Sequence, residues 1–186
     1  MRWDALFEDL EAQLHAADRL ELEAEVNERA RMELAAVDLA NRLRGQMGKQ
    51  LRVSVGENLK FDGALAHVGS TWLVLNEGVR SVLVPVAAVQ LIEGMGRHAA
   101  ADGSAARRLG LGSALRGLGR DRAPVGLYLA GSSGTVAAEG VIDRVGADSF
   151  DVAAVPSGED RRAANVRSVY TVPFTAIAAL VSRRLD

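Results

Sequence analysis

The sequence contains no cysteine, and only 4% of its 186 residues are aromatic. The missing cysteines exclude disulfides, thiolate metal ligands and cysteine nucleophiles, and they fit a reducing compartment. No apolar run approaches the roughly 20 residues that span a bilayer. Acidic residues interrupt the first ten positions, where an export signal needs an apolar stretch. We therefore expect a cytoplasmic protein that does not enter a membrane.

Lysine is almost absent too, because nearly all of the basic residues are arginine. The formal net charge is -2, but its distribution along the chain is uneven. Residues 1–46 carry 11 acids and 6 bases, whereas residues 47–186 carry 13 acids and 16 bases. An acidic N-terminal part therefore precedes a weakly basic remainder.

Residues 4–44 contain neither glycine nor proline and are rich in strong helix formers. At the start of this stretch, apolar residues are spaced by four and three positions, as at the seam between paired helices: Trp3, Phe7, Leu10 and Leu14. The pattern predicts a long helix over residues 1–45. We expect this helix to dock on a partner, or to form a coiled coil with a second copy, through these four residues.

Two later stretches, residues 62–89 and 139–177, resemble each other. The matching positions are glycines and prolines typical of turns and strand ends: Gly63 with Gly140, Gly69 with Gly146, and Pro85 with Pro173. Alternating apolar residues predict short strands over residues 51–55, 61–68, 71–76, 79–84, 126–130, 136–143, 149–155 and 166–172. Closely spaced short strands are typical of small barrels.

These observations predict an α+β fold in which a long N-terminal helix precedes two small antiparallel barrels, arranged as a tandem repeat. The expected domains are the helix, residues 1–45, a first barrel, residues 46–94, and a second barrel, residues 125–186. Between the barrels, residues 95–124 are rich in glycine and arginine, which predicts a linker with a possible short helix.

The first predicted barrel resembles the Sm-like fold and the wider group of SH3-like barrels. The residues that carry this resemblance are Phe61 to Leu65, Trp72 to Leu75 and the closing segment Leu91 to Gly94. Residues 68–72 replace the Asp-x-x-Met-Asn run with which Sm proteins hold a uracil, and Glu93 stands where they have arginine. The resemblance implies the fold and does not extend to an RNA pocket.

The whole chain resembles a family of uncharacterised actinobacterial proteins. The resemblance rests on residues 1–10, 115–118, 121–125 and 145–151. Some members are labelled Fis-family transcriptional regulators. Fis-type DNA binding needs a helix-turn-helix near the C-terminus, where this sequence predicts strands instead.

No group of residues predicts catalysis, a cofactor or a metal site. The three histidines, His15, His67 and His98, are far apart in sequence, whereas zinc needs three or four converging ligands. The glycines of residues 110–119 lack the spacing of a phosphate-binding loop. We therefore expect that the protein is not an enzyme.

A cluster of arginines gives the strongest binding signal: Arg107, Arg108, Arg116, Arg120 and Arg122. Such a cluster can attract the phosphates of a nucleic acid or an acidic partner. The acidic N-terminal helix of the same chain is a third possible partner. The alternative is that these arginines form an ordinary solvated surface with no binding function. Few aromatics accompany the arginines, which argues against stacking on a single strand.

The leading functional hypothesis is a non-catalytic interaction or adaptor module, whose partner is another protein or a second copy of the chain. A regulator that binds nucleic acid through the arginine cluster is the first alternative. An enzyme of unknown type is the second.

Overall fold

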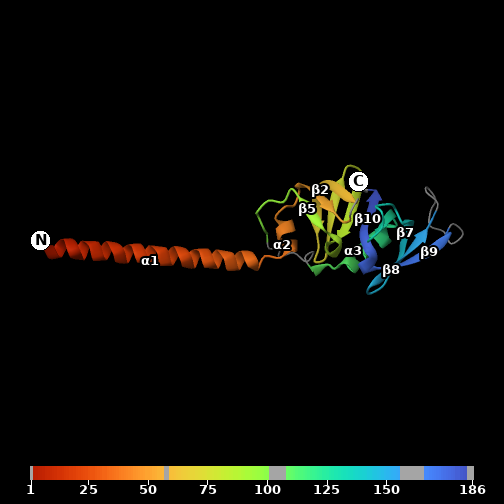
Figure 1. Ribbon diagram of the computed structural model, residues 1–186. Helices are drawn as coiled ribbons and strands as arrows, with labels where there is room; N and C mark the ends of the chain where they lie inside the picture. The colour runs from red at the N-terminus through yellow and green to blue at the C-terminus, as the bar shows by residue number, and fades with distance from the viewer. Residues whose placement is uncertain (1, 57–58, 101–107, 156–165, 184–186) are drawn as a thin grey trace. The chain divides into compact units, whose positions relative to one another are not determined.

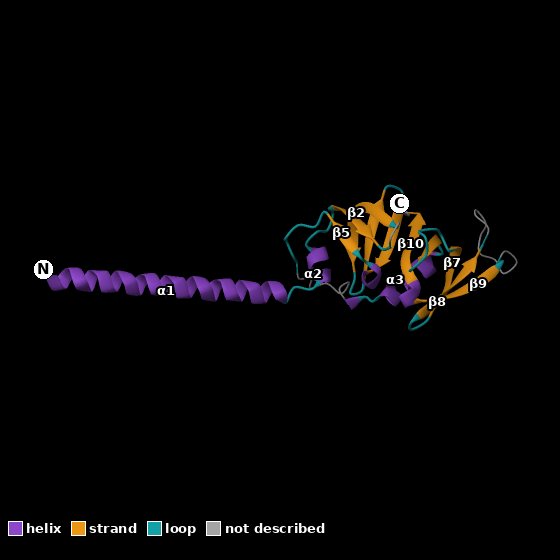
Figure 2. Ribbon diagram, viewed as in Figure 1, coloured by secondary structure: helices purple, strands orange, loops and turns teal. Residues whose placement is uncertain are grey.

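The structure is a computed structural model that describes residues 2–56, 59–100, 108–155 and 166–183. The chain divides into two compact units, residues 1–38 and residues 39–186. The first unit consists of one helix, α1 (Arg2–Ala35), which is 34 residues long. The second unit holds the remaining helices and all the described strands (Figures 1 and 2).

The second unit begins with helix α2 (Leu39–Arg44), and its described residues form ten strands and helix α3 (Leu111–Asp121). Its first strands are β1 (Gln50–Ser54), β2 (Lys60–Val68), β3 (Trp72–Glu77), β4 (Arg80–Pro85) and β5 (Leu91–Glu93). After α3 follow β6 (Pro124–Leu129), β7 (Ala138–Val145), β8 (Ser149–Ala154), β9 (Ser168–Pro173) and β10 (Ile177–Arg183). A 3-10 turn follows each of two strands, η1 (Val86–Ala88) after β4 and η4 (Phe174–Ala176) after β9.

The predicted fold class, a helix followed by two closed barrels, is wrong. The described strands form a single open sheet of ten antiparallel strands in the order β5-β1-β2-β3-β4-β10-β6-β7-β8-β9. The reason lies in β10, which pairs with β6 on one side and with β4 on the other. The last strand therefore joins the two halves of the sheet instead of closing one of them.

The two halves of the sheet have the same internal order. The strands β5-β1-β2-β3-β4 in one half correspond in sequence to β10-β6-β7-β8-β9 in the other. The pairing register shifts once within β2, between Leu65 and His67, and once within β7, between Ile142 and Arg144. These irregularities bend the strands and increase their twist.

Glycine is required at one position in each bent strand. A Cβ atom on Gly63 would lie 2.6 Å from the Asn76 carbonyl oxygen, and one on Gly140 would lie 2.1 Å from the Ala153 carbonyl oxygen. Both separations are shorter than van der Waals contact. Any side chain at these positions would push β2 away from β3, or β7 away from β8.

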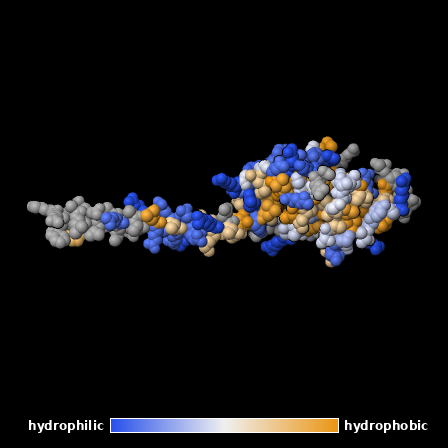
Figure 3. Space-filling view, viewed as in Figure 1, coloured by the Kyte–Doolittle hydropathy of each residue, from blue (hydrophilic) through white to orange (hydrophobic). Residues whose placement is uncertain are grey.

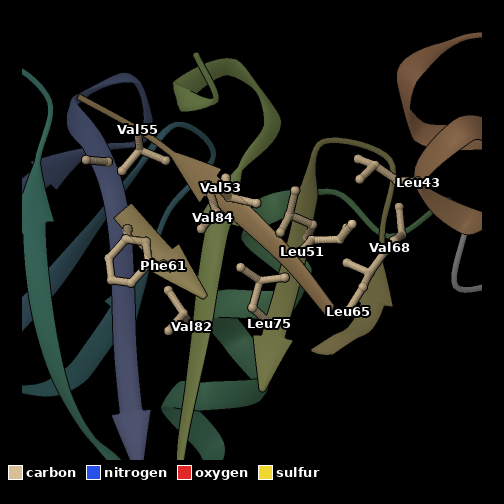
Figure 4. Close-up of a cluster of buried hydrophobic side chains, with 13 residues drawn as sticks. Leu43, Leu51, Val53, Val55, Phe61, Leu65, Val68, Leu75, Val82 and Val84 are labelled. Atoms are coloured by element: carbon tan, nitrogen blue, oxygen red, sulfur yellow. The ribbon is translucent and has the colours of Figure 1, made fainter. Parts of the chain in front are cut away.

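The core consists of two clusters of buried apolar side chains. Figure 4 shows the first cluster, to which β1, β2, β3 and β4 contribute most of the residues. The second cluster contains residues of α3 and of strands β6 to β10. In β4, Val82 and Val84 belong to the first cluster and Leu83 belongs to the second. Because successive side chains of a strand point to opposite faces, the central strands have one cluster on each face.

A polar contact network fixes α2 and the segment after β5. Gln46 is fully buried, and its Oε1 accepts hydrogen bonds from the Gly96 N–H (2.9 Å) and Lys49 Nζ (2.8 Å). Its Nε2 donates to the His98 carbonyl at 2.6 Å. The Ala100 N–H donates to the Asn41 carbonyl at 3.0 Å. The beginning of the segment predicted as a linker is therefore bonded to α2 and the turn that follows it.

We predict that Gly140→Ala lowers the free energy of unfolding by about 2 kcal/mol or more, because the new methyl group would overlap a backbone oxygen. The matched control is Gly117→Ala in α3, where a Cβ meets nothing within 4 Å. Alanine should stabilise that helical position by about 0.5–1 kcal/mol. Urea unfolding of both variants checks the pair. Equal stability of the two variants would contradict the assigned β7–β8 register.

Candidate functional site

Helix α3 packs closely against β7. Leu111 and Leu115 lie on its inner face and are buried in the second cluster. Gly119 follows one turn after Leu115, and a Cβ there would lie 3.3 Å from the Cγ2 atom of Ile142. The small residue lets the last turns of the helix approach the strand. This packing leaves the opposite face of α3 at the surface.

The residues before α3 are anchored on the turn between β2 and β3. The Leu109 carbonyl accepts hydrogen bonds from Trp72 Nε1 (2.8 Å), the Ser70 N–H (3.2 Å) and Ser70 Oγ (3.1 Å). The Leu111 N–H donates to Thr71 Oγ1 at 3.3 Å. The start of α3 is therefore fixed by the first half of the sheet, while the helix itself packs on the second half.

A cleft of about 640 Å³ lies between α3 and β7. The residues that line it are Leu109, Ser113, Arg116, Gly119, Arg120, Ile142, Asp143 and Val145. Arg116 and Arg120 are one helical turn apart, and Arg116 Nη2 donates to the Gly146 carbonyl at 3.3 Å. Two guanidinium groups and a serine hydroxyl suit an anion. The carboxylate of Asp143 reduces the net positive charge of the same cleft.

Of the five predicted arginines, the structure places two in one cleft. Arg116 and Arg120 share the cleft, and Arg108, Arg116, Arg120 and Arg122 are all exposed. Arg122 caps α3 in the left-handed conformation, with φ 50°. Arg107 lies outside the described residues. The helical repeat explains the result, since only residues three or four apart share a face of α3.

A second cleft, of about 650 Å³, was not predicted from the sequence. Its lining comes from the end of β1, from η1 and from the chain after β6: Val55, Gly56, Leu59, Ala87, Ala88, Gln90, Leu129, Ala130, Gly131, Ser132 and Ser133. None of these residues is charged. Ser132 Oγ donates to the Leu129 carbonyl at 2.7 Å, so this hydroxyl holds the turn after β6. Small apolar residues carry no motif, so this cleft has no signature in the sequence.

The predicted helix interaction face lies on α1. Phe7 is 59% exposed, and the side chains of Trp3, Leu10 and Leu14 are outside what the structure describes. Over the described part of the chain, no three His, Asp or Glu side chains gather in a way that could hold a metal ion. The helices described are also too short or too polar to cross a membrane.

We predict that Trp72→Phe lowers the free energy of unfolding by about 1 kcal/mol, because it removes the shortest of the three hydrogen bonds to the Leu109 carbonyl. The matched control is Trp3→Phe in α1, the same chemical change in the other unit. Urea unfolding of both variants is followed by circular dichroism, because Trp72→Phe keeps only Trp3, in the other unit, as a fluorophore. An unfolding midpoint of Trp72→Phe equal to that of the unmodified protein would show that this bond does not hold α3.

Comparison with known proteins gives no assignment. No protein-family model matches the sequence, and no curated protein is similar to it. The resemblance to an actinobacterial family therefore stays a prediction, and the surfaces described above are the basis for a functional proposal.

Proposed function

We propose that the protein is a non-catalytic interaction module that associates with a second copy of itself through α1, with the two helices parallel. The observation that carries the proposal is the exposure of large apolar side chains along this helix. Phe7, which lies at a seam position, is 59% exposed, and four large apolar residues outside the seam positions, Leu20, Leu22, Val26 and Met32, are between 57% and 67% exposed. Figure 3 shows apolar residues between the hydrophilic ones on the described part of the helix.

A helix of this kind needs a partner to be stable. The unit formed by residues 1–38 contains α1 and no second element on which the helix could pack within that unit. Most helical stability in proteins comes from packing of an apolar face rather than from intrinsic propensity. Ion pairs such as Glu25 with Arg29, at 2.9 Å, add little because both side chains are well exposed.

The first half of α1 has the heptad register of a paired helix. In this register the d positions are Trp3, Leu10 and Ala17, and the a positions are Phe7 and Leu14. The neighbouring e positions are all acidic: Asp4, Glu11 and Asp18. The g positions are uncharged: Leu6, Gln13 and Leu20.

These flanking positions favour parallel pairing of two copies. In a parallel pair, e positions face g positions of the partner helix, so each acid lies beside an uncharged residue. In an antiparallel pair, e positions face e positions, which would put acids opposite acids. Like charges at this distance are destabilising, so the parallel arrangement has the lower free energy.

The double variant Leu10→Asp, Leu14→Asp should separate the helices, because it places charges in the apolar seam. We expect the dissociation constant to rise at least about 100-fold, corresponding to two or more tenfold steps of about 1.4 kcal/mol. Sedimentation equilibrium of the full chain measures this as a halving of the particle mass.

The matched control is Ala12→Asp, which introduces the same residue at position f of the heptad, away from the seam. Circular dichroism shows whether the helix itself survives in each variant. If the unmodified chain sediments at its own mass of 19.7 kDa at every concentration, self-association through α1 is excluded.

The cleft between α3 and β7 supports a second candidate function, binding of a nucleic-acid backbone. The support comes from the position of Arg116 and Arg120 in one cleft, with Arg108 and Arg122 also exposed at the two ends of α3. Guanidinium groups spaced along a helix can contact successive phosphates.

If this function holds, Arg116→Gln with Arg120→Gln weakens binding to duplex DNA at low salt at least about tenfold and lowers the salt slope by about 2. Fluorescence anisotropy with a labelled duplex gives both quantities. Arg19→Gln with Arg31→Gln in α1 is the control, because it removes the same charge elsewhere. No binding by the unmodified protein at low salt would end this candidate.

A further inference from the structure

The two outermost strands of the sheet differ in what they expose. In the described residues, β9 pairs only with β8, and β5 pairs only with β1. β9 carries two large exposed side chains, Val169 (53%) and Tyr170 (47%), and the shorter β5 carries one, Leu91 (56%). An exposed apolar edge strand is a template for pairing with another chain.

The exposure of Tyr170 is unusual for its place in the fold. It lies three residues before Pro173, the last residue of β9, and Val82 lies three residues before Pro85, the last residue of β4. Val82 is 0% exposed. The difference follows from the neighbouring strand, because β10 covers the edge of β4 and no described strand covers that of β9.

The register of β9 shows which of its backbone groups have no partner in a described strand. The Phe174 N–H donates to the Asp148 carbonyl at 2.7 Å, while Pro173 lies opposite Ser149. In an antiparallel ladder this makes the Pro173 pair a non-hydrogen-bonded one. Alternation then directs the backbone groups of Val172, Tyr170 and Ser168 to β8. Those of Val169 and Thr171 point away from the sheet.

We infer that the edge of β9 that no described strand covers pairs with β9 of a second copy, antiparallel, about a two-fold axis at Tyr170. In this register Val169 of each copy faces Thr171 of the other copy. The outward N–H groups and carbonyls of Val169 and Thr171 then pair with those of the second copy, which gives four hydrogen bonds. Pro173 has no N–H, so a shifted register that needs a donor there is disfavoured.

The side chains also suit self-pairing. Residues 168–172 carry no charge, so the two-fold axis brings no like charges together. Tyr170 meets Tyr170 of the second copy in the non-hydrogen-bonded position, where side chains are closest. Aromatic cross-strand pairs contribute to sheet stability. The pairing also covers the side chain of Tyr170, which is 47% exposed.

The other edge of the sheet fits β9 less well. β5 has only three residues, and Gly94 follows it with a φ of +92°, which turns the chain away from the strand direction. A ladder between β9 and β5 would end after these three positions. The longer, uncharged β9 of a second copy therefore offers more hydrogen bonds.

A single introduced cysteine tests the two-fold register, since the natural sequence contains none. Tyr170→Cys places two thiols in a directly opposed, non-hydrogen-bonded pair, where the Cα separation of about 4.5 Å lies within the range that disulfides span. The experiment uses the full chain with Leu10→Asp and Leu14→Asp, so that association through α1 does not contribute. Under mild oxidation, the disulfide-linked dimer should form at least about tenfold faster than in the control, because pairing holds the thiols together.

The control is Val79→Cys in the same background, an exposed position (73%) in the turn between β3 and β4. Equal cross-linking of the two variants overturns the inference. A Tyr170→Cys chain that cross-links to a Leu91→Cys chain, and not to itself, overturns it too, because it shows pairing of β9 with β5.

Val169→Lys in that background provides a measurement without cysteine. Lysine on an edge strand opposes pairing, and the side chain at this position is already exposed, so the fold should be retained. The dimer population in sedimentation velocity should fall at least about tenfold. A monomeric Leu10→Asp, Leu14→Asp chain at all accessible concentrations would overturn the inference while leaving the association through α1 intact.

Discussion

The antiparallel pairing of β4 with β10 holds the second unit together. Four consecutive residue pairs, from Leu83 with Leu180 to Arg80 with Arg183, join strands that are nearly one hundred positions apart in sequence. Both strands contribute side chains to the two buried clusters, so each cluster depends on residues from both halves. Without this pairing, Leu83 and Leu180 would lose their cover, and the sheet would separate into two five-stranded pieces.

The hydrogen bonds at the start of α3 also connect the two halves of the sheet. The helix packs on β7 in the second half, while the carbonyl of Leu109 is bonded to Ser70 and Trp72 in the first. A displacement of one half would therefore move the start of α3 relative to its own packing surface. The cleft with Arg116 and Arg120 lies along this helix. The shape of this cleft thus depends on the pairing of β4 with β10, although neither arginine is near these strands in sequence.

Much of the local structure could be predicted from the sequence, whereas the way the strands combine could not. Alternating apolar residues located the first four strands. The single helix predicted over residues 1–45 is two helices, because α1 ends at Ala35 and α2 covers Leu39–Arg44. The partner of β10 has no local signature, because hydrogen bonds between strands use backbone atoms common to all residues. One signal was nevertheless present. Residues 82–84 and 177–181 are uninterrupted apolar runs, which are typical of strands buried on both faces, as the central strands of a sheet are. The arginines could be found from composition, but the helical repeat decided that Arg116 and Arg120 share a cleft.

The long separation of β4 and β10 also has a consequence during translation. Ribosomes add about 5–20 residues per second, so roughly 5 to 18 seconds pass between the synthesis of β4, which ends at Pro85, and that of β10, which begins at Ile177. Throughout this interval the nascent chain carries an unpaired strand edge beside Val82 and Leu83. Such edges are targets for aggregation, and folding limited by distant contacts is slow. The edge of β4 is therefore covered only when β10, the last strand to be synthesised, leaves the ribosome.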